Sequence, residues 1–267
     1  MLTQEEINET WTIRSDNYNK YVCEELATDR PEKWITLIEE NAPKNRPLRI
    51  LDCGCGPGFF SAILSKAGHQ VTGIDGSVRM LSHARENARK LGVEPELLEG
   101  DFGCLPFPDN TFDLLVSRNV THTIREHFKV YGEWNRVLKP GGVLLIFDAN
   151  WHLPYQPGTV REEAIRREWE GLEKYGSGFT YDGSHEYIDS ELDPPEFRVF
   201  GSAVRPDFDM GVLRQLPFGE LSFDRDVTEE LWSEKEKCMY GATPLYMLRA
   251  VKLRKEVINN EKHSETL

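Results

Sequence analysis

Short apolar runs alternate with helix-like stretches between residues 48 and 149. The apolar runs are bounded by glycine, proline or aspartate, and the stretches between them place apolar residues at helical spacing. This alternation is typical of consecutive βα units that build a parallel sheet. The expected strands are 48–52, 70–75, 95–101, 112–117 and 142–149, and the expected helices are 59–68, 78–92 and 127–142.

The segments that flank this region differ from it in composition. Residues 1–47 are polar and helix-like with scattered aromatic residues, which favours a helical lid. Residues 150–217 combine many aromatic residues with glycine, proline and charge, which favours a cap inserted over the sheet. Alternating character then returns, and we expect strands at 220–227 and 244–252 with a helix between them.

The predicted fold class is α/β, with a doubly wound and mostly parallel sheet. At this length we expect one large domain that carries a substantial insertion. The expected parts are a lid at 1–47, a core formed by 48–149 and 218–255, a cap insertion at 150–217, and a flexible tail at 256–267.

Composition narrows the range of functions. The chain has 267 residues, with 32 Lys and Arg against 45 Asp and Glu, and its formal net charge is -13. An acidic chain lacks the cation-rich surface that binds polyanions, which argues against a nucleic acid partner. The N-terminus has no basic stretch followed by an apolar run, and no run approaches the ~20 apolar residues of a membrane span. We therefore expect a cytoplasmic protein with no membrane partner.

The cysteines do not form a recognisable scaffold. The chain has five, an odd number, and they are scattered, which predicts reduced thiols. Cys53 and Cys55 lie two positions apart in a glycine-rich turn, but a tetrahedral metal site needs about four well-placed ligands. We therefore expect no metal.

The segment LDCGCGPGFF, residues 51–60, is the most informative part of the sequence. It places Asp52 at the end of the first expected strand, and Gly54, Gly56 and Gly58 in the turn that opens the next helix. Glycines let the backbone turn tightly and approach a ligand closely, because no Cβ is in the way. The alternative is a tight connection that binds nothing.

Acidic residues at later strand ends extend this pattern. Asp75 follows Asp52 by 23 residues and ends the second strand, where a carboxylate can accept both ribose hydroxyls of a nucleoside. Asp101 ends the third strand next to Phe102, which suits an acceptor for an adenine amino group beside an aromatic wall. The alternatives are a helix N-cap for Asp75 and a turn cap for Asp101.

The position of Asp52 separates two classes of nucleotide ligand. A pyrophosphate favours a neutral loop at a helix N-terminus, and the Asp52 carboxylate would repel it. A ligand that carries an ammonium group would instead be attracted. A nicotinamide-dependent oxidoreductase is thus the alternative that this residue argues against.

From about residue 50 to residue 149 the chain resembles the class I S-adenosylmethionine-dependent methyltransferases, of the small-molecule, ubiquinone-biosynthesis-methyltransferase-like type. The resemblance rests on LDCGCGPG, VTGIDGSVRML, GDFGCLPFPDNTFDLLVSRN and RVLKPGG, in this order and spacing. It implies a seven-stranded Rossmann-like sheet with an antiparallel last strand, S-adenosyl-L-methionine as cofactor and S-adenosyl-L-homocysteine as product.

The resemblance also implies the residues that contact the cofactor. They comprise a set along the methionine part, one residue at the ribose, a set around the adenine, a pair near the sulfonium, and a phenol from the lid near the methyl group. In that order they are Gly54, Gly56 and Gly58; Asp75; Gly76, Met80, Asp101 and Phe102; Arg118 and Asn119; and Tyr18. We expect Asp52 and Cys55 of the same loop to contact the cofactor as well.

Methyl transfer from a sulfonium is an in-line displacement with a neutral leaving group, so alignment and exclusion of water matter most. A base is needed when the acceptor is a hydroxyl or an ammonium. His122 follows the fourth strand and is the nearest titratable candidate; the alternative is a partly buried histidine satisfied by backbone groups. Tyr18 is the second candidate catalytic residue, and its alternative is simple packing.

The cap is expected to supply the acceptor site. Its candidate substrate-binding residues are Trp151, Tyr155, Phe179 and Tyr181 as apolar walls, and His122 with His152 as polar anchors. The alternative is a second small aromatic core. The expected partner is a small-molecule methyl acceptor, and the chain is expected to be a monomer or homodimer. A non-catalytic S-adenosylmethionine-binding protein stays a further alternative.

Overall fold

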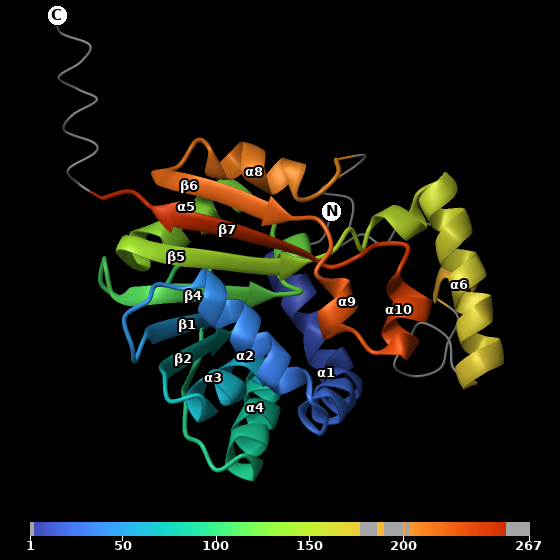
Figure 1. Cartoon of the computed structure of the whole chain (residues 1–267), viewed down its shortest axis with the longest axis horizontal. Helices are drawn as coiled ribbons and strands as arrows, with labels where there is room; N and C mark the ends of the chain where they lie inside the picture. The colour runs from blue at the N-terminus through green and yellow to red at the C-terminus, as the bar shows by residue number, and fades with distance from the viewer. Residues whose placement is uncertain (1–2, 177–185, 190–199, 201–202, 255–267) are drawn as a thin grey trace, which may run out of the picture.

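The strands of the chain assemble into one seven-stranded sheet with helices on both faces (Figure 1). The computed structural model describes residues 3–176, 186–189, 200 and 203–254. Strand order is β3-β2-β1-β4-β5-β7-β6, with β1 to β5 parallel and β7 antiparallel to both of its neighbours. The predicted doubly wound sheet with an antiparallel last strand is confirmed. The strands are Arg49–Cys53 (β1), Gln70–Asp75 (β2), Glu96–Glu99 (β3), Phe112–Arg118 (β4), Leu138–Asp148 (β5), Phe218–Asp224 (β6) and Tyr246–Lys252 (β7).

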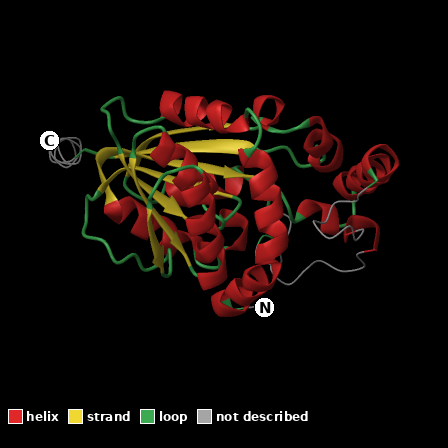
Figure 2. Cartoon of the chain, turned by 90° about the horizontal axis from the view of Figure 1, so that it is seen from below, coloured by secondary structure: helices red, strands yellow, loops and turns green. Residues whose placement is uncertain are grey.

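The sheet lies between two layers of helices, which Figure 2 shows with the strands in yellow. Their longer members run for three turns or more, and short 3₁₀ turns follow β4 and β5. The helices are Gln4–Leu26 (α1), Arg30–Asn41 (α2), Phe59–Lys66 (α3), Val78–Lys90 (α4), Thr121–Thr123 (η1), His127–Val137 (α5), Leu153–Tyr155 (η2), Thr159–Tyr175 (α6), Glu186–Asp189 (α7), Asp207–Leu213 (α8), Thr228–Leu231 (α9) and Glu234–Tyr240 (α10).

Alternation along the strands builds a hydrophobic core on each face of the sheet. In β1, Leu51 faces the cluster beneath α5 and α8, while Ile50 faces the cluster beneath α2 and α3. Successive side chains of a strand point to opposite faces, and parallel strands buried on both sides therefore carry nearly continuous apolar runs. This is why the strands were recognisable in the sequence.

The structure moves the boundary between one predicted helix and the strand that follows it, and it divides another predicted helix. The helix expected at 127–142 ends at Val137, and β5 begins at Leu138, which pairs with Phe112. Pro140 explains the difference, because proline cannot continue a helix and biases the residue before it towards extended backbone. The last expected helix is divided into α9 and α10, since Ser233 and Glu236 form a capping box that starts a new helix.

Two helices lie in the core layers rather than in the lid or cap where the sequence placed them. Trp34 and Ile38 of α2 are fully buried against the sheet, whereas residues of α1 line the pocket at the strand ends. Met210 and Leu213 of α8 pack in the other core cluster, although the predicted cap runs to residue 217. The sequence shows that both helices carry apolar residues, but it does not show which part of the protein those residues pack against.

Candidate functional site

A pocket opens at the carboxyl ends of β1, β2 and β4, under the N-terminal helix α1. Parallel α/β sheets bind ligands at this edge, where the strand order reverses between β1 and β4. The lining comes from α1, from the glycine-rich loop after β1, and from the segments that follow β2, β3 and β4. It consists of Ile7, Asn8, Trp11, Tyr18, Val22, Asp52, Gly54, Cys55, Gly56, Pro57, Phe59, Phe60, Asp75, Gly76, Ser77, Met80, Phe102, Arg118, Asn119, Val120 and Thr123.

The glycine-rich loop forms the floor of the pocket with left-handed backbone at each of its glycines. Gly54 has φ +69° and Gly56 has φ +51°, a conformation that residues with a side chain rarely adopt. A Cβ on Gly54 would lie 2.5 Å from Val120, and one on Gly56 would lie 3.7 Å from the Tyr18 ring across the pocket. The loop therefore brings bare backbone to the ligand space.

Gly58 has a different role from its two predecessors. It also has positive φ, +80°, but it does not line the pocket. A Cβ at this position would lie 2.7 Å from the Cβ of Ala84, so the missing side chain lets α3 pack against α4. Gly58 thus has a packing role, and its contact with the cofactor stays a prediction.

Asp75 joins the end of β2 to the loop. Its carboxylate accepts hydrogen bonds from the backbone N–H of Gly56 at 2.8 Å and of Ser77 at 2.9 Å. A carboxylate offers about four lone-pair sites, so capacity for further donors remains. Burial raises the pKa of Asp75, and the two backbone donors oppose that shift. The residue thus fixes the loop and presents acceptor oxygens to the pocket.

Asp52 is a buried carboxylate at the end of β1. It is 2% exposed, it lines the pocket, and it accepts a hydrogen bond from Ser61 Oγ at 2.7 Å. Burial raises the pKa of Asp52 to about 6, against the opposing effects of Ser61 and the Arg118 charge. A carboxyl group with this pKa gains a proton close to neutral pH, and a nearby cation would favour its charged form.

Arg118 brings a positive charge to the pocket wall at the end of β4. Its guanidinium makes two hydrogen bonds of 2.9 Å to the Glu25 carboxylate of α1, and it lies 4.3 Å from the centre of the Phe59 ring. Burial disfavours this charge, but Glu25 outweighs that effect and the pKa of Arg118 lies above its usual range. The pair neutralises the cation and fastens α1 to the sheet.

Asn119 lines the pocket and, within the described part of the chain, has a buried acceptor without a partner. Its backbone is left-handed, with φ +56°, and its buried Oδ1 has no hydrogen-bond partner among the described residues. A buried amide oxygen without a donor costs about 1–3 kcal/mol.

Helix α1 covers the pocket and is attached at several points. Thr12 Oγ1 donates to Ser77 Oγ at 2.8 Å, and Asp16 pairs with Arg79 and with His83 of α4. Trp11 and Tyr18 pack edge to face with ring centres 5.8 Å apart, and both line the pocket. These contacts support the prediction of a lid that includes Tyr18.

Asp101 lies outside the pocket lining. Its Oδ1 accepts a hydrogen bond from the backbone N–H of Gly103 at 2.7 Å, which is the turn cap that the sequence left as the alternative. Phe102, by contrast, is 8% exposed and lines the pocket, as does Met80. The aromatic wall is therefore present, and the contact of Asp101 with adenine stays a prediction.

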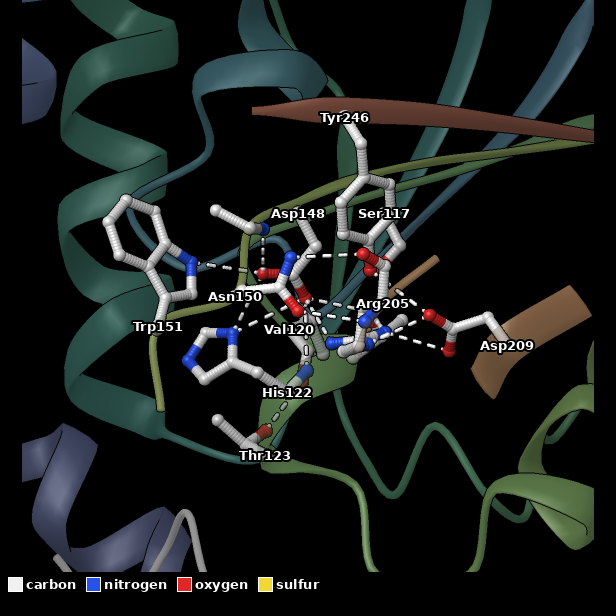
Figure 3. A network of polar contacts seen from close by, with 12 residues as sticks. Ser117, Val120, His122, Thr123, Asp148, Asn150, Trp151, Arg205, Asp209 and Tyr246 are labelled. Atoms are coloured by element: carbon white, nitrogen blue, oxygen red, sulfur yellow. Dashed lines mark hydrogen bonds and ion pairs between the residues drawn. The ribbon is translucent and has the colours of Figure 1, made fainter. Parts of the chain in front are cut away.

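His122 lies behind the pocket wall in a buried polar network (Figure 3). The residue is 4% exposed, and its Nδ1 is 3.0 Å from Asp148 Oδ1. Its ring packs against that of Trp11, a lining residue, with the ring centres 6.4 Å apart. His122 itself does not line the pocket, and its catalytic role stays a prediction.

The other predicted cap residues lie in packed surroundings. Trp151 donates its indole N–H to Asp148 Oδ1 at 3.0 Å and stacks on Trp232. His152 is fully buried, its Nε2 donates to the Ala203 carbonyl at 3.0 Å, and it does not line the pocket. Tyr155 packs on Tyr187. Such contacts are typical of a second small core, and a substrate contact for these residues stays a prediction. Phe179 and Tyr181 lie outside the described residues.

Sequence reasoning missed most of the lid side of the pocket. Asn8 and Trp11 of α1 both line it, and Asn8 approaches Gly76 so closely that a Cβ there would be 2.6 Å from its Nδ2. A polar helix with scattered aromatic residues was the only signal for them. Within the described residues no group of three or more metal-binding side chains comes together, and no helix is long and apolar enough to cross a membrane.

The seven-stranded sheet and the pocket at its carboxyl edge have the arrangement that the resemblance to class I methyltransferases implied. In the comparison with known families, residues 51–146 match the family described as methyltransferase domain. The chain therefore carries a methyltransferase domain, and S-adenosyl-L-methionine is the cofactor of this class.

Characterised relatives share this domain but not their full length with the chain. A malonyl-[acyl-carrier protein] O-methyltransferase of Erwinia pyrifoliae is 41% identical over 109 residues, which cover 41% of this chain and 40% of that protein. A demethylmenaquinone methyltransferase of Thermus thermophilus is 35% identical over 118 residues, which cover 43% of this chain and 54% of that protein. The chain thus spans about half the length of these relatives.

A solved structure extends the likeness to almost the whole fold. The crystal structure of the [4+2]-cyclase SpnF has a TM-score of 0.62 and covers 94% of this chain and 97% of its own, at 18% sequence identity. Likeness at this identity shows the fold alone, because one fold hosts many chemistries.

The raised pKa of Asp52 predicts pH-dependent donor binding. S-adenosylmethionine is a cation at its sulfonium and amino groups, so it should favour ionised Asp52. As pH falls through about 6, Asp52 becomes protonated in the free protein, and affinity should fall by roughly tenfold for each further pH unit. Calorimetric titration between about pH 5 and pH 8 measures this slope.

The matched control for this prediction is Asp52→Asn, which keeps the size of the side chain and an acceptor for Ser61. This variant should bind S-adenosylmethionine more weakly than the unsubstituted protein near pH 8, and its affinity should depend less on pH. A slope equal to that of the unsubstituted protein would assign the titration to another group, such as Asp75, whose pKa burial also raises.

Proposed function

We propose that this protein transfers the methyl group of S-adenosylmethionine to a small-molecule acceptor by in-line displacement. The observation that carries the proposal is the pocket under α1, where the glycine-rich loop, the Asp75 carboxylate and Asn119 converge. Each feature matches one part of the donor. The activity of the named relatives, which act on malonyl-[acyl-carrier protein] and demethylmenaquinone, supports the reaction class.

Different residues of the pocket suit different parts of S-adenosylmethionine. Asp52 and the Asn119 amide oxygen suit the amino group of the methionine part, since both are acceptors and Asp52 attracts positive charge. Asp75 suits the ribose hydroxyls, and Met80 with Phe102 suits the two sides of the adenine. The bound donor supplies an electrophilic methyl group on a sulfonium.

The lid and the cap would align the acceptor and exclude water. Tyr18 and Trp11 close the pocket from α1, and displacement at a sulfonium depends mainly on alignment and a dry site. His122 is the proposed base for acceptors that must lose a proton, with Trp151, Tyr155, Phe179 and Tyr181 as proposed walls and His152 as a proposed anchor of the acceptor site. A monomer or homodimer in the cytoplasm is the proposed setting.

The decisive experiment combines donor binding with turnover. Calorimetry should detect S-adenosylmethionine and S-adenosylhomocysteine, and no binding of nicotinamide dinucleotides. Incubation with a panel of hydroxyl, amine and carboxylate acceptors should then release S-adenosylhomocysteine. Donor binding without turnover of any acceptor would favour a non-catalytic binding protein, and binding of nicotinamide dinucleotides alone would refute the proposal.

A further inference from the structure

The lid helix α1 brings a polar side chain to the pocket at the end of β2. Asn8 lines the pocket together with Asp75, Gly76 and Ser77, which form the turn between β2 and α4. Thr12, one turn further along α1, holds the lid to this turn, since its Oγ1 lies 2.8 Å from Ser77 Oγ. Asn8 thus lies at the strand end that carries the Asp75 carboxylate.

The glycine at position 76 fits the close approach of this asparagine. Gly76 does not have positive φ, so its backbone conformation does not require a glycine. A Cβ there would instead lie 2.6 Å from Asn8 Nδ2 and 3.1 Å from Asn8 Cγ, so an alanine would displace the Asn8 amide. The missing side chain therefore makes room for that amide against the turn.

The side-chain amide of Asn8 is available to a ligand. Within the described part of the chain, the hydrogen bond of this residue runs from Thr12 Oγ1 to its backbone carbonyl at 2.8 Å and leaves the amide without a protein partner. An amide offers two N–H donors and one carbonyl acceptor. A ligand that replaces water at these groups must supply equivalent hydrogen bonds.

The chemistry of a ribose explains why an N–H donor is needed beside Asp75. Each ribose hydroxyl carries one hydrogen and two lone pairs. The ionised carboxylate of Asp75 only accepts, so it can take the hydrogens but cannot donate to the oxygen lone pairs. A neighbouring N–H donor would complete the hydrogen bonds of the sugar.

The other polar side chains of the pocket are less well placed for this task. Ser77 Oγ caps α4 and is joined to Thr12. Arg118 and Asn119 lie at the end of β4, which β1 separates from β2 in the sheet. Asn8 therefore supplies the side-chain N–H at the end of β2.

Helix α1 is held more firmly at its C-terminal end than beside Asn8. Near that end, Glu25 accepts two hydrogen bonds of 2.9 Å from Arg118, and both side chains are less than a tenth exposed. Nearer Asn8, Asp16 pairs with Arg79, and these two side chains are 52% and 54% exposed. Exposed ion pairs contribute little to stability, whereas breaking a buried pair is costly. The half of α1 that carries Asn8 can therefore move aside to admit a ligand.

We propose that Asn8 is a cofactor-binding residue supplied by the lid, and that its amide N–H binds a ribose oxygen while Asp75 accepts the ribose hydrogens. This inference rests on the proposed methyl transfer and deepens it, because recognition of the sugar is shared between the sheet and the lid. The bond forms when α1 is closed over the pocket. A cofactor with both ribose hydroxyls therefore stabilises the closed lid better than a deoxy analogue does.

The test measures the affinity of the full-length protein for S-adenosylhomocysteine and for its 2′-deoxy and 3′-deoxy analogues by calorimetry. Asn8→Ala removes the amide, and Asn8→Leu removes it while keeping a side chain of similar size. Asn17→Ala is the matched control, because it makes the same change on the same helix outside the pocket lining, where Asn17 bonds to Lys20. Thermal unfolding shows whether each variant folds.

Asn8→Ala and Asn8→Leu should each weaken binding of S-adenosylhomocysteine by about three- to tenfold, as expected for loss of one neutral hydrogen bond. The loss should be less than about twofold for the deoxy analogue that lacks the bound oxygen, because that ligand never makes the bond. Asn17→Ala should bind all three ligands as the unsubstituted protein does. A loss that depends on one ribose oxygen distinguishes a hydrogen bond from packing of α1.

Equal losses for all three ligands would overturn the inference, because they would show that Asn8 acts by packing alone. Unchanged affinity for S-adenosylhomocysteine in both folded Asn8 variants would overturn it as well, as would a matching loss in Asn17→Ala. These results leave the proposed methyl transfer in place. If the unsubstituted protein bound neither S-adenosylmethionine nor S-adenosylhomocysteine, the proposed function itself would be refuted.

Discussion

Replacing Gly56 with valine should abolish binding of S-adenosylhomocysteine while the protein still folds. A branched side chain at this position would project towards Tyr18 across the pocket, where even a Cβ lies 3.7 Å from the ring. It would occupy the space of the ligand's methionine part. We expect a loss of more than about 1000-fold, which corresponds to about 4 kcal/mol. Calorimetry and thermal unfolding measure the two properties.

The chain offers a matched control for the backbone strain of this substitution. Gly92 also has positive φ, +72°, but nothing lies within 4 Å of the Cβ that a substitution would add. Gly92→Val therefore introduces similar strain at a distance from the pocket. The affinity of this variant for S-adenosylhomocysteine should equal that of the unsubstituted protein. Normal binding by Gly56→Val would show that the loop is only a connection between β1 and α3.

Replacing Asp75 with alanine should weaken donor binding by about tenfold to 100-fold. The loss combines charge-assisted hydrogen bonds to the ribose, worth roughly 1.5–3 kcal/mol, with loss of the anchor for the Gly56 N–H. Asp75→Asn keeps the shape of the side chain and one acceptor oxygen. Its affinity should therefore lie between those of the unsubstituted protein and Asp75→Ala. Titration with S-adenosylhomocysteine checks both variants, and unchanged affinity in Asp75→Ala would place the ribose elsewhere.

The core of the fold was predictable because its signals are local. The run LRILD precedes a glycine-rich turn, and the acidic residues 52 and 75 end adjacent parallel strands, so one edge of the sheet collects them. Parallel strands buried on both faces leave an apolar run that needs no knowledge of partners. The donor side of the pocket follows from the same local pattern.

The lid contacts were not predictable, because their partners are distant in sequence. Glu25 and Arg118 are 93 positions apart, and neither position has a neighbour that indicates the other. A helix with low amphipathicity gives little indication of which side faces the protein. Tyr18 was selected from the lid by resemblance, whereas Asn8 and Trp11 had no such support.

The buried ion pairs of Arg205 with Asp148 and Asp209 were also not predictable from the sequence. Arg205 lies in a segment rich in charged and aromatic residues, and arginine is almost never fully buried unless it is paired. Sequence alone therefore favours an exposed position. Only the fold brings it to Asp148, 57 positions earlier in the chain.

The insertion after β5 leaves and rejoins the core at one point. Asn150 Nδ2 donates to the carbonyl of Arg205 at 2.9 Å, and the Arg205 backbone N–H donates to Asn150 Oδ1 at 2.8 Å. These two bonds join residues 55 positions apart and hold the two ends of the segment together. Extending a loop whose ends are already fastened costs little, about 0.6 kcal/mol for each doubling of its length. The intervening chain can therefore change in length while the strands keep their register.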